Sequence, residues 1–248
     1  MALTDYGTAL VTGATSGIGR ATVRALTGRG LTVHAAGRRA DRLASLADET
    51  GAIGHVIDLA ETDKIHPAFG DLGIDILVNN AGLGRGSGGV LRSSPADIDQ
   101  TLGINVLSAA HVIRAVLPGM VARDRGHVVN LGSISGLHAM ASAIYGASKG
   151  AIHLLSQNLR VELAGSRVRV TEICPGRVRT EFFDHSIPDD PAAREAYTSG
   201  FEILEPEDVA DAIVYALDVP WRVNVATLEL LPTEQIVGGV NIVAVKSD

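Results

Sequence analysis

The chain contains a single cysteine, Cys174, among its 248 residues. One cysteine cannot form a disulfide within the chain, and no cysteines and histidines stand together at the spacing of a metal cluster. We therefore expect no metal site, and we interpret Cys174 as a buried strand residue rather than a nucleophile.

Long apolar runs and an excess of positive charge are also lacking. No apolar run reaches the roughly 20 residues that a membrane helix needs, and the N-terminus has no basic segment followed by an apolar signal core. We therefore expect no membrane partner and a cytoplasmic location. The formal net charge of -7 argues against a nucleic-acid partner, because nucleic-acid binders normally carry a basic face.

What the chain does have is the composition of a globular protein, with 46% hydrophobic and 20% charged residues. A parallel sheet with helices on both faces routinely takes a chain of this length as one domain. We predict a single domain spanning residues 1–248.

Short apolar runs alternate with segments in which apolar residues recur three and four positions apart, the helical period. The predicted strands are 8–12, 31–36, 55–57, 74–78, 127–131, 168–174 and 225–230, and the predicted helices are 18–26, 41–47, 96–122, 145–163 and 207–217. This alternation predicts an α/β fold, a doubly wound sheet of about seven parallel strands with helices on both faces. The irregular residues 181–205 predict a long loop over the substrate, with one short helix at most.

A glycine-rich string, TGATSGIG, runs from Thr12 to Gly19 between the first strand and the first helix. In that context its glycines permit a tight turn, close approach of the backbone to a pyrophosphate and close helix packing. The alternative is a glycine-rich turn without a ligand. The predicted dinucleotide ligands in this string are Gly13, Thr15, Ser16, Gly17, Ile18 and Gly19.

The second strand ends at Arg38 and Arg39 rather than at a carboxylate. An acid at this position binds the ribose hydroxyls of NAD, whereas guanidinium groups bind the 2′-phosphate of NADP through charge-assisted hydrogen bonds. NADP is therefore favoured over NAD. The alternative is that Arg39 and Arg42 lie on a solvated helix start.

Two further segments follow strands at the same edge of the sheet. Asp58, with Leu59 after it, could receive the adenine amino group, and Asn80, Ala81 and Gly82 could lie close to the ribose. Purely structural turns explain these residues almost as well.

Tyr145 and Lys149 stand four residues apart on a predicted helix, and Ser133 follows the preceding strand. Reducing a ketone requires a proton donor at the oxygen. An ammonium near a tyrosine favours the phenolate, so we expect Lys149 to lower the pKa of Tyr145, while Ser133 stabilises the developing oxyanion. The alternative is an exposed tyrosine, a surface lysine and a capping serine.

Taken in order, these motifs resemble the short-chain dehydrogenase/reductase family over nearly the whole chain. The resemblance rests on Thr12-Gly-x-x-x-Gly17-x-Gly19, Asn79-Asn-Ala-Gly82, Asn105, Ser133, Tyr145-x-x-x-Lys149 and Pro175-Gly176. It implies a Rossmann-type fold, a homodimer or homotetramer, and a catalytic tetrad of Asn105, Ser133, Tyr145 and Lys149. It also implies that Tyr145 and Lys149 lie at the nicotinamide ribose, and that Pro175, Gly176, Val178 and Thr180 lie at the nicotinamide.

Within that family the chain is similar to the NADP-dependent 3-hydroxy acid or serine-type dehydrogenases. The motifs are Gly37-Arg-Arg39, Thr180-Glu-Phe182, Val223-Asn-Val225 and Leu228-Glu-Leu-Leu-Pro232. The expected substrate is a secondary alcohol or ketone, such as a 3-hydroxy acid or a β-hydroxy amino acid, in contact with Ser135, His138, Arg177 and Phe182. A reductase of a bulkier ketone in secondary metabolism and a non-enzymatic NADP-binding sensor are the alternatives.

Overall fold

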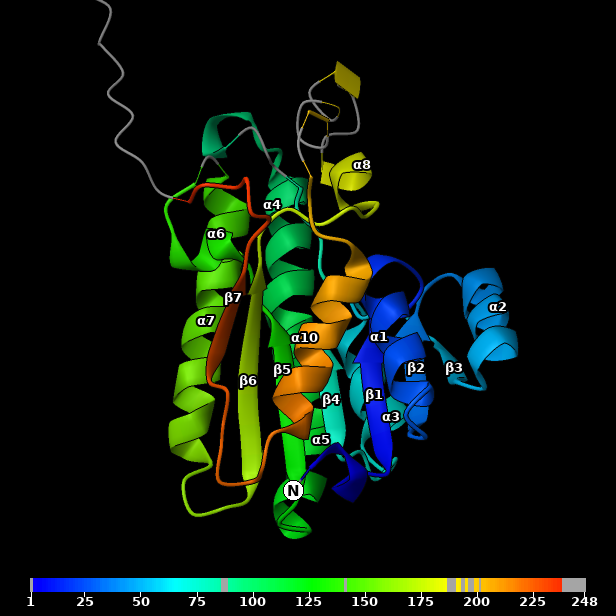
Figure 1. Ribbon diagram of the computed structural model, residues 1–248. Helices are drawn as coiled ribbons and strands as arrows, with labels where there is room; N and C mark the ends of the chain where they lie inside the picture. Colours follow the sequence, from blue (N-terminus) through cyan, green and yellow to red (C-terminus); the bar gives the residue numbers. More distant parts are fainter. Residues whose placement is uncertain are drawn as a thin grey trace, which may run out of the picture.

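Seven parallel strands form one sheet in the described part of the computed structural model (Figure 1). The structure describes residues 2–85, 89–140, 142–186, 191–192, 195, 199–200 and 202–237. The strands are β1 (Thr8–Thr12), β2 (Thr32–Gly37), β3 (Ile53–Val56), β4 (Ile76–Asn79), β5 (Gly126–Leu131), β6 (Val168–Pro175) and β7 (Thr227–Leu230). Their order is β3-β2-β1-β4-β5-β6-β7. The predicted doubly wound parallel sheet is confirmed.

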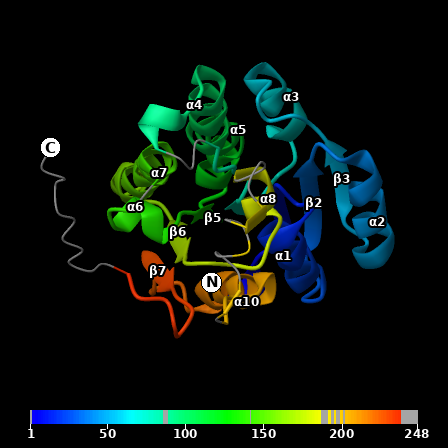
Figure 2. The ribbon, with the colours of Figure 1, turned by 90° about the horizontal axis from the view of Figure 1, so that it is seen from above.

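Helices cover both faces of this sheet. They are α1 (Gly17–Thr27), α2 (Ala40–Thr50), α3 (Ile65–Phe69), α4 (Pro95–Leu102), α5 (Ala109–Ala122), α6 (Ile134–Leu137), α7 (Ala143–Glu162), α8 (Phe182–Ser186) and α10 (Pro206–Asp218). Short 3-10 turns lie at η1 (Leu3–Asp5), η2 (Thr62–Lys64) and η3 (Val90–Arg92), and a π-helical segment, η4 (Gly103–Ser108), joins α4 to α5. Seen from above, α1, α2 and α10 lie on one side of the sheet, and α3, α5 and α7 lie on the other (Figure 2).

The alternation of side chains along each strand explains the two layers. On β1, Val11 packs with Val23 of α1 and Ile213 of α10, whereas Leu10 packs on the other face with Ile113 of α5. Each strand therefore needs apolar residues at successive positions, which is why the buried strands are continuous apolar runs. β3 lies at the sheet edge and is partly exposed, with Val56 63% accessible.

Helix 96–122, predicted as one continuous segment, is interrupted by η4. The combined helix Pro95–Ala122 is the one helix among the described residues that is long and apolar enough to cross a membrane. Buried residues such as Val112, Val116 and Met120 pack it against the sheet, so we interpret it as a core helix. Of the predicted loop at residues 181–205, the structure describes α8 and a few later residues; the rest lies outside the described residues.

The strand order places a crevice above β1 and β4. The chain crosses from β1 to β2 on one side and continues from β4 to β5 on the other, so the connections diverge at the carboxyl ends of these two strands. Ligands of doubly wound sheets bind at such a point.

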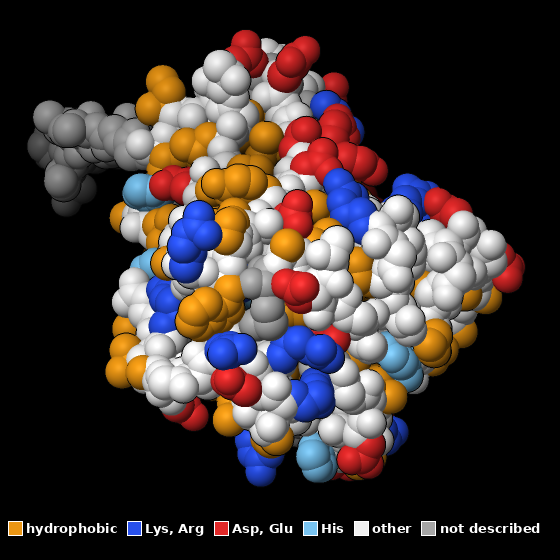
Figure 3. Space-filling view, turned by 60° about the horizontal axis from the view of Figure 1, so that its bottom comes forward, with side chains coloured by type: hydrophobic (Ala, Val, Ile, Leu, Met, Phe, Trp, Pro, Cys, Tyr) orange, Lys and Arg blue, Asp and Glu red, His pale blue; other side chains and the backbone are white. Residues whose placement is uncertain are grey.

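On the face of the molecule shown in Figure 3, acidic and basic side chains lie close to one another with apolar side chains between them.

Candidate active site

A cavity of about 540 Å³ lies at the carboxyl ends of the strands and brings most of the predicted site residues together. The predicted cofactor residues that line it are Gly13, Thr15, Ser16, Gly17, Ile18, Arg38, Arg39, Asp58, Leu59, Asn80, Ala81, Gly82, Tyr145, Lys149, Pro175, Gly176, Val178 and Thr180. Ser133 and the predicted substrate residues Ser135, Arg177 and Phe182 line it as well. Gly19, Asn105 and His138 do not.

The glycine-rich turn fits a dinucleotide because side chains would fill it. Gly13 and Gly17 have positive φ angles of 65° and 49°. A Cβ on Gly13 would come within 2.9 Å of the Ala81 Cα, and one on Gly17 within 2.8 Å of the Thr180 Cγ2. A Cβ on Gly19 would clash with the Gly13 carbonyl oxygen, so Gly19 acts by packing beneath the turn. The N-terminus of α1 is thereby left open to an anion in the cavity.

The two arginines after β2 differ in their contacts. Arg39 Nη2 lies 2.8 Å from both Thr15 Oγ1 and Ser16 Oγ, and its Nη1 donates to Glu181 Oε2 at 2.8 Å. Arg38 is 70% exposed, and its nearest ionic contact is Asp58 at 3.9 Å. Arg38 is thus the arginine that can turn to a 2′-phosphate, whereas Arg39 already holds the glycine-rich turn.

Glu181 also lines the cavity, and its place in the site was not predicted from the sequence. Its carboxylate accepts from Arg39 and from Arg42 Nη1, the latter at 2.5 Å, and these guanidinium groups lower its pKa. The only sequence signal was its place in the Thr180-Glu-Phe182 motif. Glu181 links the start of α8 to the predicted phosphate site.

We expect Glu181→Gln to raise the affinity for NADPH relative to NADH about two- to fivefold, because a partly exposed carboxylate near the predicted phosphate site would no longer repel the 2′-phosphate. Fluorescence titration with each nucleotide measures this ratio. Glu205→Gln is the matched control, since Glu205 binds Arg179 outside the cavity at 2.7 Å. An unchanged ratio in Glu181→Gln would show that the charge of Glu181 does not affect binding of the 2′-phosphate.

The polar groups of the predicted reaction centre converge on one wall of the cavity. Tyr145 and Lys149 project from α7, and the Lys149 ammonium lies 5.9 Å from the centre of the Tyr145 ring. Lys149 is 6% exposed, and its Nζ donates to the Leu131 carbonyl oxygen at 2.6 Å. Ser133 caps α6, accepting from Ser135 N at 3.1 Å, and its side chain hydrogen-bonds Tyr145. Phe182 packs on Tyr145 with 5.2 Å between ring centres.

The predicted lowering of the pKa of Tyr145 is wrong in direction. Desolvation at this wall raises the pKa of Tyr145 to about 12, although the hydrogen bond with Ser133 opposes the rise. Burial also lowers the pKa of Lys149 to about 8, because the interior destabilises the charged ammonium. Tyr145 is therefore protonated at neutral pH and suited to donate a proton.

Comparison with protein families identifies the chain. The family described as short chain dehydrogenase matches residues 7–191. The chain belongs to the short-chain dehydrogenase family. This dehydrogenase is 40% identical over 235 residues to the uncharacterized short-chain type dehydrogenase/reductase y4eK of Sinorhizobium fredii, covering 94% of each chain.

Relatives with assigned activities indicate the cofactor and the type of reaction. The NADP-dependent 3-hydroxy acid dehydrogenase YdfG of Escherichia coli K12 is 38% identical over 242 residues, covering 94% of this chain and 98% of YdfG. The closed form of a serine dehydrogenase complexed with NADP+ superposes with a TM-score of 0.92 at 38% identity, covering 96% of this chain and 99% of that one. The dehydrogenase is thus an NADP-dependent oxidoreductase that acts on the CH–OH group, and its glycine-rich turn and exposed Arg38 fit that cofactor.

Asn105 lies next to the reaction centre but faces the protein interior. Its Oδ1 accepts from Leu83 N at 2.8 Å, and its Nδ2 donates to the Leu83 carbonyl oxygen and to Ser148 Oγ at 2.8 and 2.9 Å. Gly82 separates it from Lys149, because a Cβ there would lie 3.3 Å from Asn105 Oδ1 and 3.7 Å from Lys149 Nζ. η4 provides this position, and π-helical turns often occur at functional sites.

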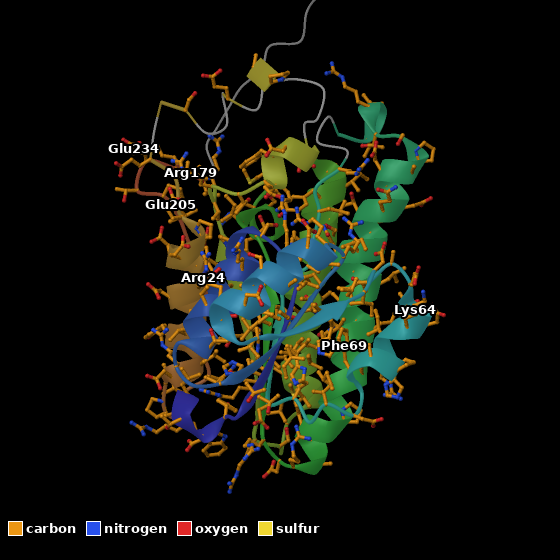
Figure 4. All side chains as sticks on the ribbon, turned by 90° about the vertical axis from the view of Figure 1, so that its right-hand side faces the viewer. Arg24, Lys64, Phe69, Arg179, Glu205 and Glu234 are labelled. Carbon is orange, nitrogen blue, oxygen red and sulfur yellow. The ribbon has the colours of Figure 1, made fainter. Side chains whose placement is uncertain are left out.

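His138, predicted to line the substrate cleft, lies outside the cavity. Its Nε2 is 2.8 Å from Glu229 Oε1 on β7, because the chain turns outward after α6. Arg179 also points away: Figure 4 shows it beside Glu205 and Glu234 at the outer edge of the molecule. Arg177 is thus the one arginine of this segment that lines the cavity.

Two cavity residues had no distinct signal in the sequence. Gln235 reaches the cavity from the segment after β7, and its Oε1 accepts from Arg177 N at 2.8 Å. Arg85 follows the Asn-Ala-Gly turn, and its Nη1 lies 3.6 Å from Asp97 Oδ1.

Proposed function

We propose that this dehydrogenase transfers hydride between NADP and a 3-hydroxy acid or a β-hydroxy amino acid, with Tyr145 as the proton-transferring group. The observation that carries the proposal is the convergence of Tyr145, Ser133 and Lys149 on the cavity that the glycine-rich turn also lines. The activities named for YdfG and for the serine dehydrogenase support the substrate class.

The chain's own groups then have distinct roles. Bound NADPH supplies the hydride for carbonyl reduction. The Tyr145 hydroxyl donates its proton to the substrate oxygen, and the Ser133 hydroxyl hydrogen-bonds that oxygen as negative charge develops on it. Lys149, held by the Leu131 carbonyl oxygen, places a positive charge near the phenol and stabilises the phenolate left after proton transfer. Asn105 keeps Leu83 and α7 in place beside these groups.

In the same proposal the cofactor and substrate occupy different parts of the cavity. The glycine-rich turn binds the pyrophosphate through Gly13, Thr15, Ser16, Gly17 and Ile18. Asp58 and Leu59 lie at the adenine, Asn80 to Gly82 at the ribose, and Pro175, Gly176, Val178 and Thr180 at the nicotinamide. Ser135, Arg177 and Phe182 contact the substrate, where the guanidinium of Arg177 binds its carboxylate.

We expect Arg177→Ala to raise the KM for hydroxy acids about tenfold or more, with little change for a neutral alcohol of similar size. The reason is that the variant loses the charged partner of the carboxylate. Steady-state kinetics on both substrates measures the effect, and Arg179→Ala is the matched control because Arg179 lies outside the cavity.

Three outcomes of the kinetic experiments would lead to different conclusions about the substrate. A KM increase confined to the acid supports the carboxylate contact. Equal increases for the acid and the neutral alcohol would contradict it. Turnover of bulky cyclic ketones in preference to any acid, in a screen of the unmodified enzyme with NADPH, would overturn the substrate class while leaving the chemistry of Tyr145 intact.

We also propose that residues 1–248 act as a single domain, in a homodimer or homotetramer in the cytoplasm. The helical run from α4 through η4 to α5, and helix α7, carry exposed large apolar side chains, including Leu107 of η4 at 59% and Leu154 of α7 at 55%. Such side chains favour burial against a second copy.

A further inference from the structure

A buried carboxylate lies behind the reaction centre. Glu172 on β6 is fully buried, and its Oε2 lies 2.6 Å from His153 Nδ1. His153 follows Lys149 by one turn of α7, so the two side chains share a face of that helix. The other ring nitrogen of His153, Nε2, lies 2.8 Å from the Gln157 side-chain nitrogen at the exposed surface of α7. His153 thus binds Glu172 on one side and reaches an exposed contact on the other.

The second carboxylate oxygen of Glu172 points towards the end of β5. Oε1 is buried and makes no hydrogen bond to a nitrogen or oxygen atom of the described residues, but the Cys174 thiol lies on this side, and a hydrogen bond with Glu172 helps to raise the pKa of that thiol. A Cβ on Gly132 would clash with this oxygen and would lie 2.9 Å from the Cys174 Sγ. Gly132 directly follows Leu131, whose carbonyl oxygen holds the Lys149 ammonium. Glu172 is therefore packed against the same strand end that positions Lys149.

Charge explains why an acid would be kept there. An ammonium taken out of water is destabilised unless an anion or several hydrogen bonds compensate it. Burial lowers the pKa of Lys149, and the neighbouring Cys174 and, after it, Glu172 raise it in opposition. Burial, together with the charge of Glu172, raises the pKa of the Cys174 thiol, which keeps that group neutral. The negative charge that stands near Lys149 is therefore that of Glu172.

We propose that Glu172, clamped by His153, is the buried counter-charge of Lys149 and a positioning residue for the reaction. This inference rests on the role proposed above for the Tyr145–Lys149 pair. The other titratable groups that interact with Glu172 are Lys149, His153 and Arg160 from α7 and Cys174 from β6, with Glu229 of β7 paired beside Cys174.

The chain has three lysines, Lys64, Lys149 and Lys246, which makes the test direct. With lysine labelled by 13C at the ε-carbon, NMR titration of the full-length protein follows each ammonium, and Lys149→Arg assigns the signal. We expect Lys149 to titrate at lower pH than the other two lysines. In Glu172→Gln its midpoint should fall by about one further pH unit, because an isosteric amide removes the anion.

Other variants separate positioning from folding. Glu172→Asp should recover part of the shift, and His153→Ala should move the midpoint in the same direction by less. Glu229→Gln is the control, because it removes a carboxylate of the exposed His138–Glu229 pair and should leave Lys149 unchanged. An unchanged Lys149 midpoint in Glu172→Gln or in His153→Ala would overturn the proposal.

Kinetics then connects the charge to the reaction. In Glu172→Gln the alkaline limb of the pH profile of kcat/KM for carbonyl reduction should move to lower pH, by a shift that follows the NMR midpoint. A uniform loss of rate with an unmoved limb would indicate a merely structural role and contradict the proposal. Because the NMR titration needs no turnover, a failure of the proposed function is distinguishable from a failure of this inference.

Discussion

Tyr145→Phe is expected to lower kcat for NADPH-dependent carbonyl reduction about 10²- to 10⁴-fold, the usual contribution of a positioned general acid. Desolvation holds the phenol protonated, with a pKa of about 12, so the hydroxyl is the proton that the variant lacks. Phenylalanine keeps the ring and its packing against Phe182 at 5.2 Å. The loss should therefore be confined to the chemical step.

Three measurements distinguish this from a general defect. Stopped-flow turnover with NADPH should collapse, while the Kd for NADPH and the thermal midpoint should change little. Tyr215→Phe is the matched control, since Tyr215 is 59% exposed on α10 and does not line the cavity. A Tyr145→Phe enzyme that retained turnover within tenfold of the unmodified protein would disprove the role of the hydroxyl.

The second large effect concerns the cofactor. Arg38→Ala should weaken NADPH binding about 10- to 100-fold and leave NADH binding nearly unchanged, because a hydrogen bond to a charged group contributes about 1.5–3 kcal/mol. Arg38 has only a distant ionic contact with Asp58, at 3.9 Å, so its guanidinium can turn to the phosphate without breaking a strong pair. Arg39, by contrast, would have to leave Thr15, Ser16 and Glu181.

Nucleotide titrations with NADPH and NADH test this difference. Arg29→Ala is the control, because Arg29 follows α1 at its far end and its Nη1 donates to the Ala25 carbonyl oxygen at 2.9 Å. Equal weakening of both nucleotides would show that Arg38 contacts a part common to the two. Loss of NADPH affinity in Arg39→Ala instead would move the phosphate site to that residue.

Most of the fold could be predicted from the sequence because buried parallel strands are continuous apolar runs bounded by helical periods. The edge strand β3 was harder. It was predicted at residues 55–57 but runs over Ile53–Val56, since an edge strand with exposed Ile53 and Val56 lacks a clear apolar core pattern. The π-helical interruption was missed because one extra residue in a turn barely disturbs the apolar period.

The site residues were predictable where they belong to motifs that follow strand ends. Properties that depend on the three-dimensional surroundings of a side chain were not predictable. The glycine-rich turn and the Tyr145–Lys149 pair were predicted from spacing. The direction of the tyrosine pKa was not, because desolvation depends on all the segments that close the cavity. His138 was placed wrongly since spacing does not tell which way a loop turns. Glu172 was overlooked because an acid in an apolar run carries no sign of its burial.

The π-helical segment η4 makes the length of the chain here a functional property. A π-helical turn holds about one residue more than a regular α-helical turn, so deleting one residue between Gly103 and Ser108 would leave a regular helix with α4 and α5 in nearly their present orientation. Thr101, buried on α4, would then keep the Arg85 carbonyl oxygen that its hydroxyl contacts at 3.3 Å. The deletion would instead displace the side chains of the bulge itself, so its cost would fall on the position of Asn105 and not on the packing of the two helices.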